Sequence, residues 1–340
     1  MTRARRLRGF SLIELMVAIV LGLLAMLVLT RLMSQQSVAR GEIEKSGRQI
    51  ENGRYAMSLL QDDIQLAGYY GQNGGSPAVL GSLPNPCERG LTATSLSSIA
   101  TALALPIQGY NDPQLQASLP ACLDASNHRD GTDVIVIRRS AADNAVTTPA
   151  DTVANRLYLQ ATPAAMLVGA GVADDAAALV VFPLKRKDGI TPAELRRYVV
   201  HIYFISPCHV PAPAAGELCT AAADNGRPIP TLKRLELTET GFIVTPLVEG
   251  IENLQFQYGL DRNADGAPDD YESSPDVAEF SDVMAVQVHL LARATEPSAG
   301  HVDERSYQLG DVAVAAPGDD YKRQAYSVAV RAVNVSGRRE

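Results

Sequence analysis

One short acidic stretch has residue types and spacing suited to binding a metal ion. DRNADGAPDDYE, residues 261–272, carries oxygen donors at its positions 1, 3, 5, 9 and 12 and a glycine at position 6. Calcium-binding loops use this spacing, because the donors wrap the cation at about 2.3–2.6 Å while the glycine permits a sharp turn. The expected calcium ligands are Asp261, Asn263, Asp265, the carbonyl of Ala267, Asp269 and Glu272.

A hairpin turn is the competing interpretation of this stretch. Its flanks do not read as the helices of an EF-hand, because LQFQYG before it alternates like a strand and Pro268 stands inside it. Asp, Asn and Gly are also common residues of tight turns. Calcium is the one cofactor that the sequence suggests, and no other is expected.

A lone carboxylate in an apolar run is the second feature with chemical meaning. Phe10 to Leu29 is a run of 20 residues whose one ionisable side chain is Glu14. A helix of this length spans roughly 30 Å, the thickness of the hydrocarbon core of a bilayer. Four arginines precede it and should hold the N-terminus in the cytoplasm, which sends the rest of the chain across the membrane in a single pass. A carboxylate at that depth costs about 2.5–3.5 kcal/mol on insertion scales.

The order Gly9-Phe10-Ser11-Leu12-Ile13-Glu14 resembles the type IV prepilin signature. The resemblance implies that prepilin peptidase cuts between Gly9 and Phe10 and that Phe10 becomes the methylated N-terminus. It also suggests a partner for Glu14, namely the N-terminal amine of the neighbouring subunit, since a buried ion pair is favourable only when both partners are present. A signal peptide fits less well because the apolar run is too long and no A-x-A site closes it. A plain signal anchor, with Glu14 reaching toward the interface, is the other alternative.

The four cysteines predict disulfides rather than a metal site. Their even number in a domain expected outside the cytoplasm allows three pairings, and we favour Cys87–Cys122 with Cys208–Cys219 because these close two separate loops. Zinc is the alternative, but no C-x₂-C spacing occurs. The five histidines are scattered without H-E-x-x-H and no G-x-S-x-G elbow is present, so no enzyme is expected.

Composition is that of an acidic exported domain. The 340 residues are 46% hydrophobic and 5% aromatic, with no Trp and a formal net charge of −8, which becomes about −12 without the arginine-rich leader. Nonspecific nucleic-acid binding depends on Lys and Arg, so nucleic acid is not expected as a partner. The basic run at 185–187 is short and is interpreted as solvated.

One long helix, from Phe10 to Ala67, must position the apolar anchor. Its outer half carries an apolar or small residue in a 3–4 alternation that makes a narrow stripe expected to pack on a globular domain: Ile43, Ser46, Ile50, Gly53, Met57, Leu60, Ile64 and Ala67. Gly68 should end the helix. The predicted regions are a leader (1–9), a membrane and filament-core helix (10–32), its amphipathic continuation (33–68) and a periplasmic β-rich domain (69–340). An independent coiled-coil stalk is the alternative for the outer half.

Alternating residues predict strands at 133–138, 179–184, 197–205, 232–238, 254–258, 283–291 and 327–335. Few helices separate these strands, which favours antiparallel sheets. The predicted fold class is α+β, with a long N-terminal helix packed on antiparallel sheet. Residues 72–130 should be mostly loops with short elements.

Three further segments, 53–71, 247–266 and 325–339, resemble the PilW type of minor pilin. The resemblance implies a pilin fold and a low-abundance subunit that primes or tips a type IV pilus, supporting twitching motility and adhesion. Implied partners are other minor and major pilins, the pilus assembly platform and a tip adhesin, first at the inner membrane and then on the pilus. A J-type pseudopilin of type II secretion and a membrane-anchored periplasmic enzyme or receptor are the alternatives. Residues 72–200 match no family.

Overall fold

The computed structural model describes residues 11–75, 78–112, 120–143, 145–172, 181–213 and 218–337. Helix α1 (Leu12–Leu66) is followed by a β-rich unit, and the chain divides into two compact units at residues 48 and 49. Gly68 stands just after the helix with φ = 72°, a left-handed conformation that glycine adopts without strain, so the predicted end of the helix is confirmed.

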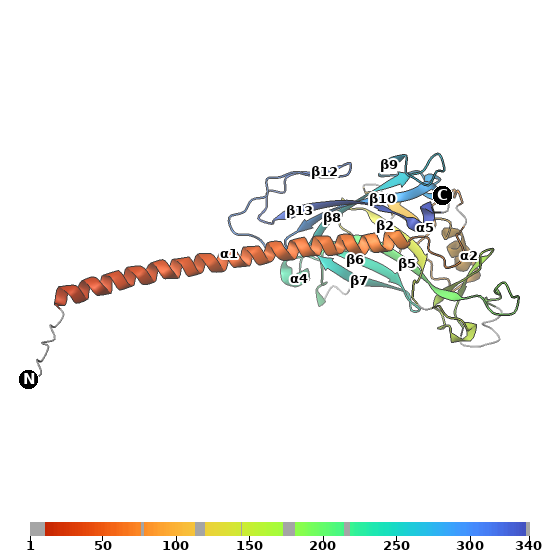
Figure 1. Cartoon of the computed structure of the whole chain (residues 1–340), viewed down its shortest axis with the longest axis horizontal. Coiled ribbons are helices and arrows are strands. Elements are labelled where there is room, and N and C mark those ends of the chain that lie inside the picture. The colour runs from red at the N-terminus through yellow and green to blue at the C-terminus, as the bar shows by residue number, and fades with distance from the viewer. Residues whose placement is uncertain are drawn as a thin grey trace, which may run out of the picture. The chain divides into compact units, whose positions relative to one another are not determined.

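Two antiparallel sheets form the β-rich unit, which confirms the predicted α+β class (Figure 1). In the seven-stranded sheet the order is β1 (Ile107–Tyr110), β2 (Val134–Ser140), β5 (Leu195–Ser206), β3 (Leu157–Ala161), β4 (Met166–Ala170), with β6 (Thr231–Leu237) and β7 (Phe242–Glu249) branching from β5. In the four-stranded sheet the order is β13 (Arg323–Arg331), β10 (Val283–Arg293), β8 (Ile251–Leu260), β9 (Asp270–Glu272). The short elements are α2 (Ala93–Ala102), α4 (Ala223–Gly226), α5 (Val333–Ser336) and the hairpin β11 (Tyr307–Leu309) with β12 (Val312–Val314).

The C-terminal part of α1 packs against both sheets (Figure 1). One apolar core joins Ala56, Met57, Leu60 and Ile64 of the helix to residues of β2, β5, β8 and β10. A second core covers the other face of the seven-stranded sheet, where α2 contributes Ile99. Most of the free energy that holds the helix on the sheets therefore comes from burial of this apolar stripe.

One predicted strand is not found in its described part, and another ends earlier than predicted. Residues 181–184 of the predicted strand 179–184 form no strand, because Phe182 packs in a small apolar cluster with Tyr158 and Leu195. The first β-bridge after them joins Lys185 to Pro192. Residues 179 and 180 lie outside the described part. The predicted strand 327–335 ends at Arg331, since α5 takes over the chain and its Ser336 hydroxyl bonds Ala332 O and Arg331.

Ile50 was expected on the packed face of α1, yet its side chain is 43% exposed and its neighbour Gln49 is buried instead. The reason is a hydrogen bond, 2.9 Å long, from the Gln49 amide to the carbonyl oxygen of Ala292 on β10. A satisfied amide can replace an apolar side chain in a buried position. The apolar stripe is therefore buried from Gly53 onward.

A segment that we call the flap, residues 294–322, covers the outer face of the four-stranded sheet. It contains the β11–β12 hairpin, and a methyl group placed on its Gly310 would lie 3.0 Å from the side-chain oxygen of Gln257 and 3.1 Å from the ring of His289. The sheet face under the flap mixes polar and apolar side chains, because His289 and Leu291 are both buried on it. The flap thus rests on a mixed face, and its own Leu309 is buried as well.

Candidate functional site: the N-terminal helix and its anchorage

Glu14 lies in the first turn of α1, where its carboxylate and Ser11 cap the helix reciprocally. The backbone N–H of Ser11 donates to Glu14 Oε2 at 3.0 Å, and the N–H of Glu14 donates to Ser11 Oγ at 3.2 Å. This is the capping-box arrangement, which satisfies donors that a helix start leaves unpaired. Gly9 and Phe10, the predicted cleavage and methylation positions, lie outside the described residues.

Among the described helices, α1 alone contains a stretch long and apolar enough to cross a membrane, and none of that stretch is buried in the protein. Its side chains are exposed along their length, from Leu12 at 76% to Leu32 at 49%. Such a surface is stable only against lipid or against other apolar helices.

At the other end of α1, Asp63 fixes the helix to the seven-stranded sheet. Its carboxylate, in a residue 5% exposed, accepts hydrogen bonds from Arg139 Nε at 2.6 Å, His201 Nδ1 at 2.6 Å and Tyr203 Oη at 2.8 Å. Burial alone would raise the pKa of Asp63, but the hydrogen bonds and charges of His201 and Arg139 outweigh it and hold that pKa well below its usual value. We call these four residues the Asp63 lock.

Sequence reasoning did not single out Asp63 as a site residue. A signal was nevertheless present, because Asp63 falls between Leu60 and Ile64 on the same helical face as the apolar stripe. A charged residue inside a buried stripe needs a partner of opposite charge. Which partner it finds could not be read, since Arg139 and His201 follow 76 and 138 residues later.

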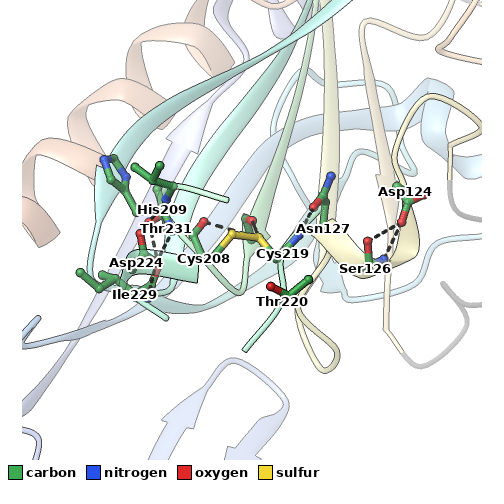
Figure 2. The surroundings of a disulfide bond; sticks show 12 residues. Asp124, Ser126, Asn127, Cys208, His209, Cys219, Thr220, Asp224, Ile229 and Thr231 are labelled. Atoms are coloured by element: carbon green, nitrogen blue, oxygen red, sulfur yellow. Dashed lines mark hydrogen bonds between the residues drawn. A yellow bond between two sulfur atoms is a disulfide. The ribbon is translucent and has the colours of Figure 1, made fainter. Parts of the chain in front are cut away.

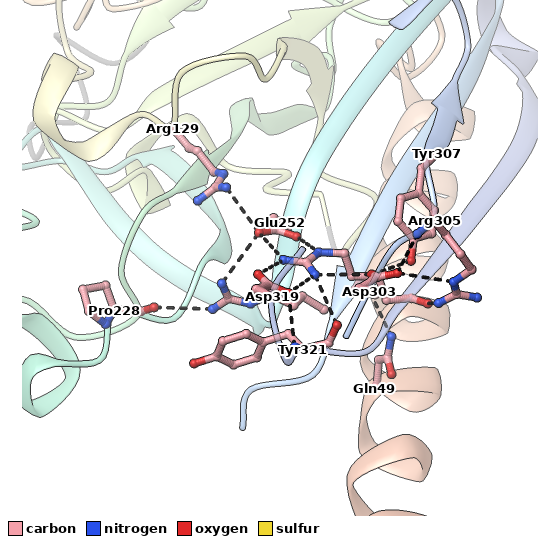
Figure 3. Close-up of polar contacts among 12 residues, drawn as sticks. Gln49, Arg129, Pro228, Glu252, Asp303, Arg305, Tyr307, Asp319 and Tyr321 are labelled. Atoms are coloured by element: carbon pink, nitrogen blue, oxygen red, sulfur yellow. Dashed lines mark hydrogen bonds and ion pairs between the residues drawn. The ribbon is translucent and has the colours of Figure 1, made fainter. Parts of the chain in front are cut away.

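A buried ionic cluster lies near Gln49, where α1 meets the four-stranded sheet (Figure 3). Arg323 of β13 is 4% exposed and pairs with Glu252 of β8 at 2.5 Å, with Asp319 at 2.6 Å and with Asp303 at 3.3 Å. Asp303 also accepts the Tyr307 hydroxyl at 2.7 Å, and burial together with this bond raises the pKa of Tyr307 to about 12. Because Asp303 and Asp319 belong to the flap, the cluster ties the flap to the sheet.

Gly53 allows the closest approach between α1 and β13. A Cβ atom at this position would lie 2.3 Å from Cε2 of Tyr326, so no larger residue fits without movement of the ring. The Tyr326 hydroxyl reaches the carbonyl of Ile50 at 3.4 Å. The helix and the edge strand are therefore matched in shape at this point.

The structure joins Cys87 to Cys122 and Cys208 to Cys219, the pairing expected from loop closure. The first closes what we call the wider disulfide loop and the second the narrower one. Beside the narrower loop, the Asp224 carboxylate accepts the backbone N–H groups of His209, Val210 and Ile229 within 2.9 Å (Figure 2). These bonds fasten the loop to the chain that leads into β6.

The acidic stretch 261–272 forms a loop between β8 and β9 that is held by its own donors. Both carboxylate oxygens of Asp261 accept backbone N–H groups, from Asp265 at 3.1 Å and from Gly266 at 2.9 Å. The other predicted side-chain ligands also have partners. Asn263 accepts the N–H of Asp265 and donates to Asp269, and Asp265 accepts the N–H of Ala267. Asp269 accepts the N–H of Arg262, and Glu272 pairs with the Arg262 guanidinium.

Within the described residues, no group of three or more His, Cys, Asp or Glu side chains is arranged to hold a metal ion. Calcium binding by the loop stays a prediction. For Glu272 to bind a cation with both oxygens, Arg262 would first have to release it.

Two family models match parts of the chain. Residues 219–334, which run from the narrower disulfide loop into α5, match PilW, the "Type IV Pilus-assembly protein W". Residues 4–30 match the "Prokaryotic N-terminal methylation motif". No curated protein matches the chain.

Proposed function

We propose that this chain, for which the two family matches support a type IV minor pilin, works in pilus assembly as a membrane-anchored subunit that enters the filament through α1. The observation that carries the proposal is the combination of a methylation motif at 4–30 with an unburied apolar helix whose first turn contains Glu14. Family membership of this kind implies other pilins and the pilus machinery as partners and favours a structural rather than a catalytic role.

The finer steps follow from the same helix. Prepilin peptidase cuts between Gly9 and Phe10, and methylated Phe10 becomes the N-terminus while the β-rich unit faces the periplasm. In the free subunit the Ser11 amide occupies the Glu14 carboxylate. In the filament Glu14 instead pairs with the N-terminal amine of a neighbouring subunit, because a full ion pair in apolar surroundings is stronger than a bond to a neutral amide.

The anchorage of α1 supports a load-bearing role for the helix. The apolar core, the Asp63 lock and the Gln49 bond attach it to both sheets at separate points. A subunit held in a filament by α1 would carry its β-rich unit with it. We place it, with other minor pilins and an adhesin, in the complex that starts the filament, where it supports twitching motility and adhesion.

Mass spectrometry of the N-terminus of the membrane-purified protein tests this function. The expected mature chain begins with methylated Phe10, and a chain that keeps residues 1–9 would refute the proposal. A deletion strain should lose twitching rather than type II secretion; the reverse result would make the chain a pseudopilin.

Glu14→Ala tests the assembly step. The variant should insert in the membrane as well as the wild type, since removal of a charge favours insertion, yet it should be absent from sheared pili. Glu44→Ala is the matched control, because Glu44 is an exposed acidic residue of the same helix beyond the apolar stretch, and it should be incorporated normally. Normal incorporation of both variants would contradict the role of Glu14.

A further inference from the structure

A basic turn, residues 184–193, carries an exposed apolar side chain that the proposed function does not use. Lys185, Arg186 and Lys187 are consecutive and exposed in a chain whose net charge is −8. Ile190 follows them and is 79% exposed, the most exposed large apolar side chain of the described residues. A single exposed apolar residue is ordinary, so the argument depends on how this one is held.

The turn is rigid. Asp188 Oδ1 accepts the backbone N–H groups of Ile190 and Thr191, both at 2.9 Å, and Gly189 takes the left-handed φ of 71° that the turn requires. Its base is clamped by Gln160, which is fully buried and exchanges two hydrogen bonds of 2.9 Å with the backbone of Leu184. The backbone that carries Ile190 is therefore held in place, so that binding there would cost little backbone conformational entropy.

The basic turn adjoins a cavity at the C-terminal end of α1. Arg186 pairs with Glu194 at 3.0 Å, and Glu194 lines a cavity of about 200 Å³ together with Arg196 and Tyr69. The Arg196 guanidinium lies over the Tyr69 ring, 5.7 Å from its centre. An exposed apolar side chain on a held backbone, cations around it and an adjacent polar cavity together give the surface the composition of an interface, which has an apolar anchor and a polar rim.

We propose that the basic turn is a docking surface for an acidic face of another kind of pilus subunit, with Ile190 entering an apolar pocket on that partner. The inference rests on the proposed function, because filament assembly is what brings other subunits alongside this chain. Charge complementarity selects the occupant, since the exposed Lys185 and Lys187 repel a basic surface and attract an acidic one, while Arg186 already pairs with Glu194.

In-cell photocrosslinking tests the docking surface with the full-length chain. A benzophenone amino acid replaces Ile190 in piliated cells, and Val302, which is 58% exposed and lies in the flap, is the control position. We expect an adduct with an acidic pilus subunit at 190 and none at 302. Lys185→Gln with Lys187→Gln should lower its yield about fivefold, the loss expected for two exposed ion pairs, while the Arg186–Glu194 pair stays intact.

An adduct with lipid, an adduct with a second copy of this chain, or a yield at 190 no higher than at 302 would overturn the inference. The N-terminal mass of the same sample separates the two proposals. A cleaved, methylated chain without the adduct refutes the docking surface alone, whereas a retained leader refutes the pilin function.

Discussion

Replacement of Asp63 by asparagine tests how the helix is held on the sheet. The substitution preserves the size of the side chain but removes its charge and replaces one of its two acceptor oxygens by an NH₂ donor. Arg139 and His201, with side chains 15% and 11% exposed, would then face a donor rather than a carboxylate. A buried cation without its partner destabilises the native state.

The expected loss follows from the burial of the pair. Breaking a buried ion pair from one side costs about 3–5 kcal/mol, and the partial exposure of Arg139 places this site at the lower end, about 3 kcal/mol. At about 2 °C per kcal/mol for a domain of this size, the melting temperature should fall by about 6 °C. Asp62→Asn is the control, because Asp62 is exposed on the same turn and should change the melting temperature by less than about 1 °C.

Thermal unfolding of the full-length protein in detergent measures this difference. Near-ultraviolet circular dichroism of the 12 tyrosines is the suitable signal, since the chain has no Trp and α1 dominates the far-ultraviolet signal. Because the folded pKa of Asp63 is lowered, its contribution is present above the unfolded value of 3.8 and is lost as pH falls below it. The difference in melting temperature between the wild type and Asp63→Asn should therefore be largest at pH 7 and become smaller in acid. Equal melting temperatures for the Asp62 and Asp63 variants would refute this account of the lock.

Three further predictions concern packing, cross-linking and metal binding. Gly53→Ala should lower the free energy of unfolding by about 1–2 kcal/mol, because its methyl group meets the Tyr326 ring. Gly47→Ala is the control, since nothing lies within 4 Å of its methyl group, and helix propensity should raise the free energy of unfolding by up to about 1 kcal/mol. Denaturant unfolding measures both changes. Replacing both cysteines of the wider disulfide loop by alanine should cost about 1 kcal/mol more than the same change in the narrower loop, because its chain separation is 35 rather than 11 residues, and equal unfolding midpoints would contradict this. Isothermal titration should detect calcium binding to the 261–272 loop, tightened in Arg262→Gln because Glu272 is released; no heat at millimolar calcium in either protein would end the prediction.

Strands with clean alternation could be predicted from the sequence, and the others could not. β8 and β10 lie where alternating apolar and polar residues place them, because one face of their sheet is apolar and the other mixes polar and apolar side chains. β3 and β4 were not predicted. All five residues of β3 are buried, so buried and exposed residues do not alternate along it. β7 contains Pro246, which reads as a strand breaker but is tolerated at a sheet edge.

The anchor of the candidate site could be predicted because it is local, whereas the lock is not. The apolar run, Glu14 and the methylation signature stand within a single stretch of sequence, and a family match covers that stretch. The Asp63 lock gathers residues from α1, β2 and β5, so its partners become neighbours only after the sheet has formed. The sequence indicated that the helix packs on the domain but not which polar atoms fix it there.

The attachment of the flap through Arg323 has a consequence for how this molecule tolerates damage. Lifting residues 294–322 would uncover an imidazole and Leu291, and it would separate the buried Arg323 guanidinium from Asp303 and Asp319. A transient detachment of this strap, or a protease cut within it, should therefore leave Arg323 with fewer partners and weaken the edge strand β13.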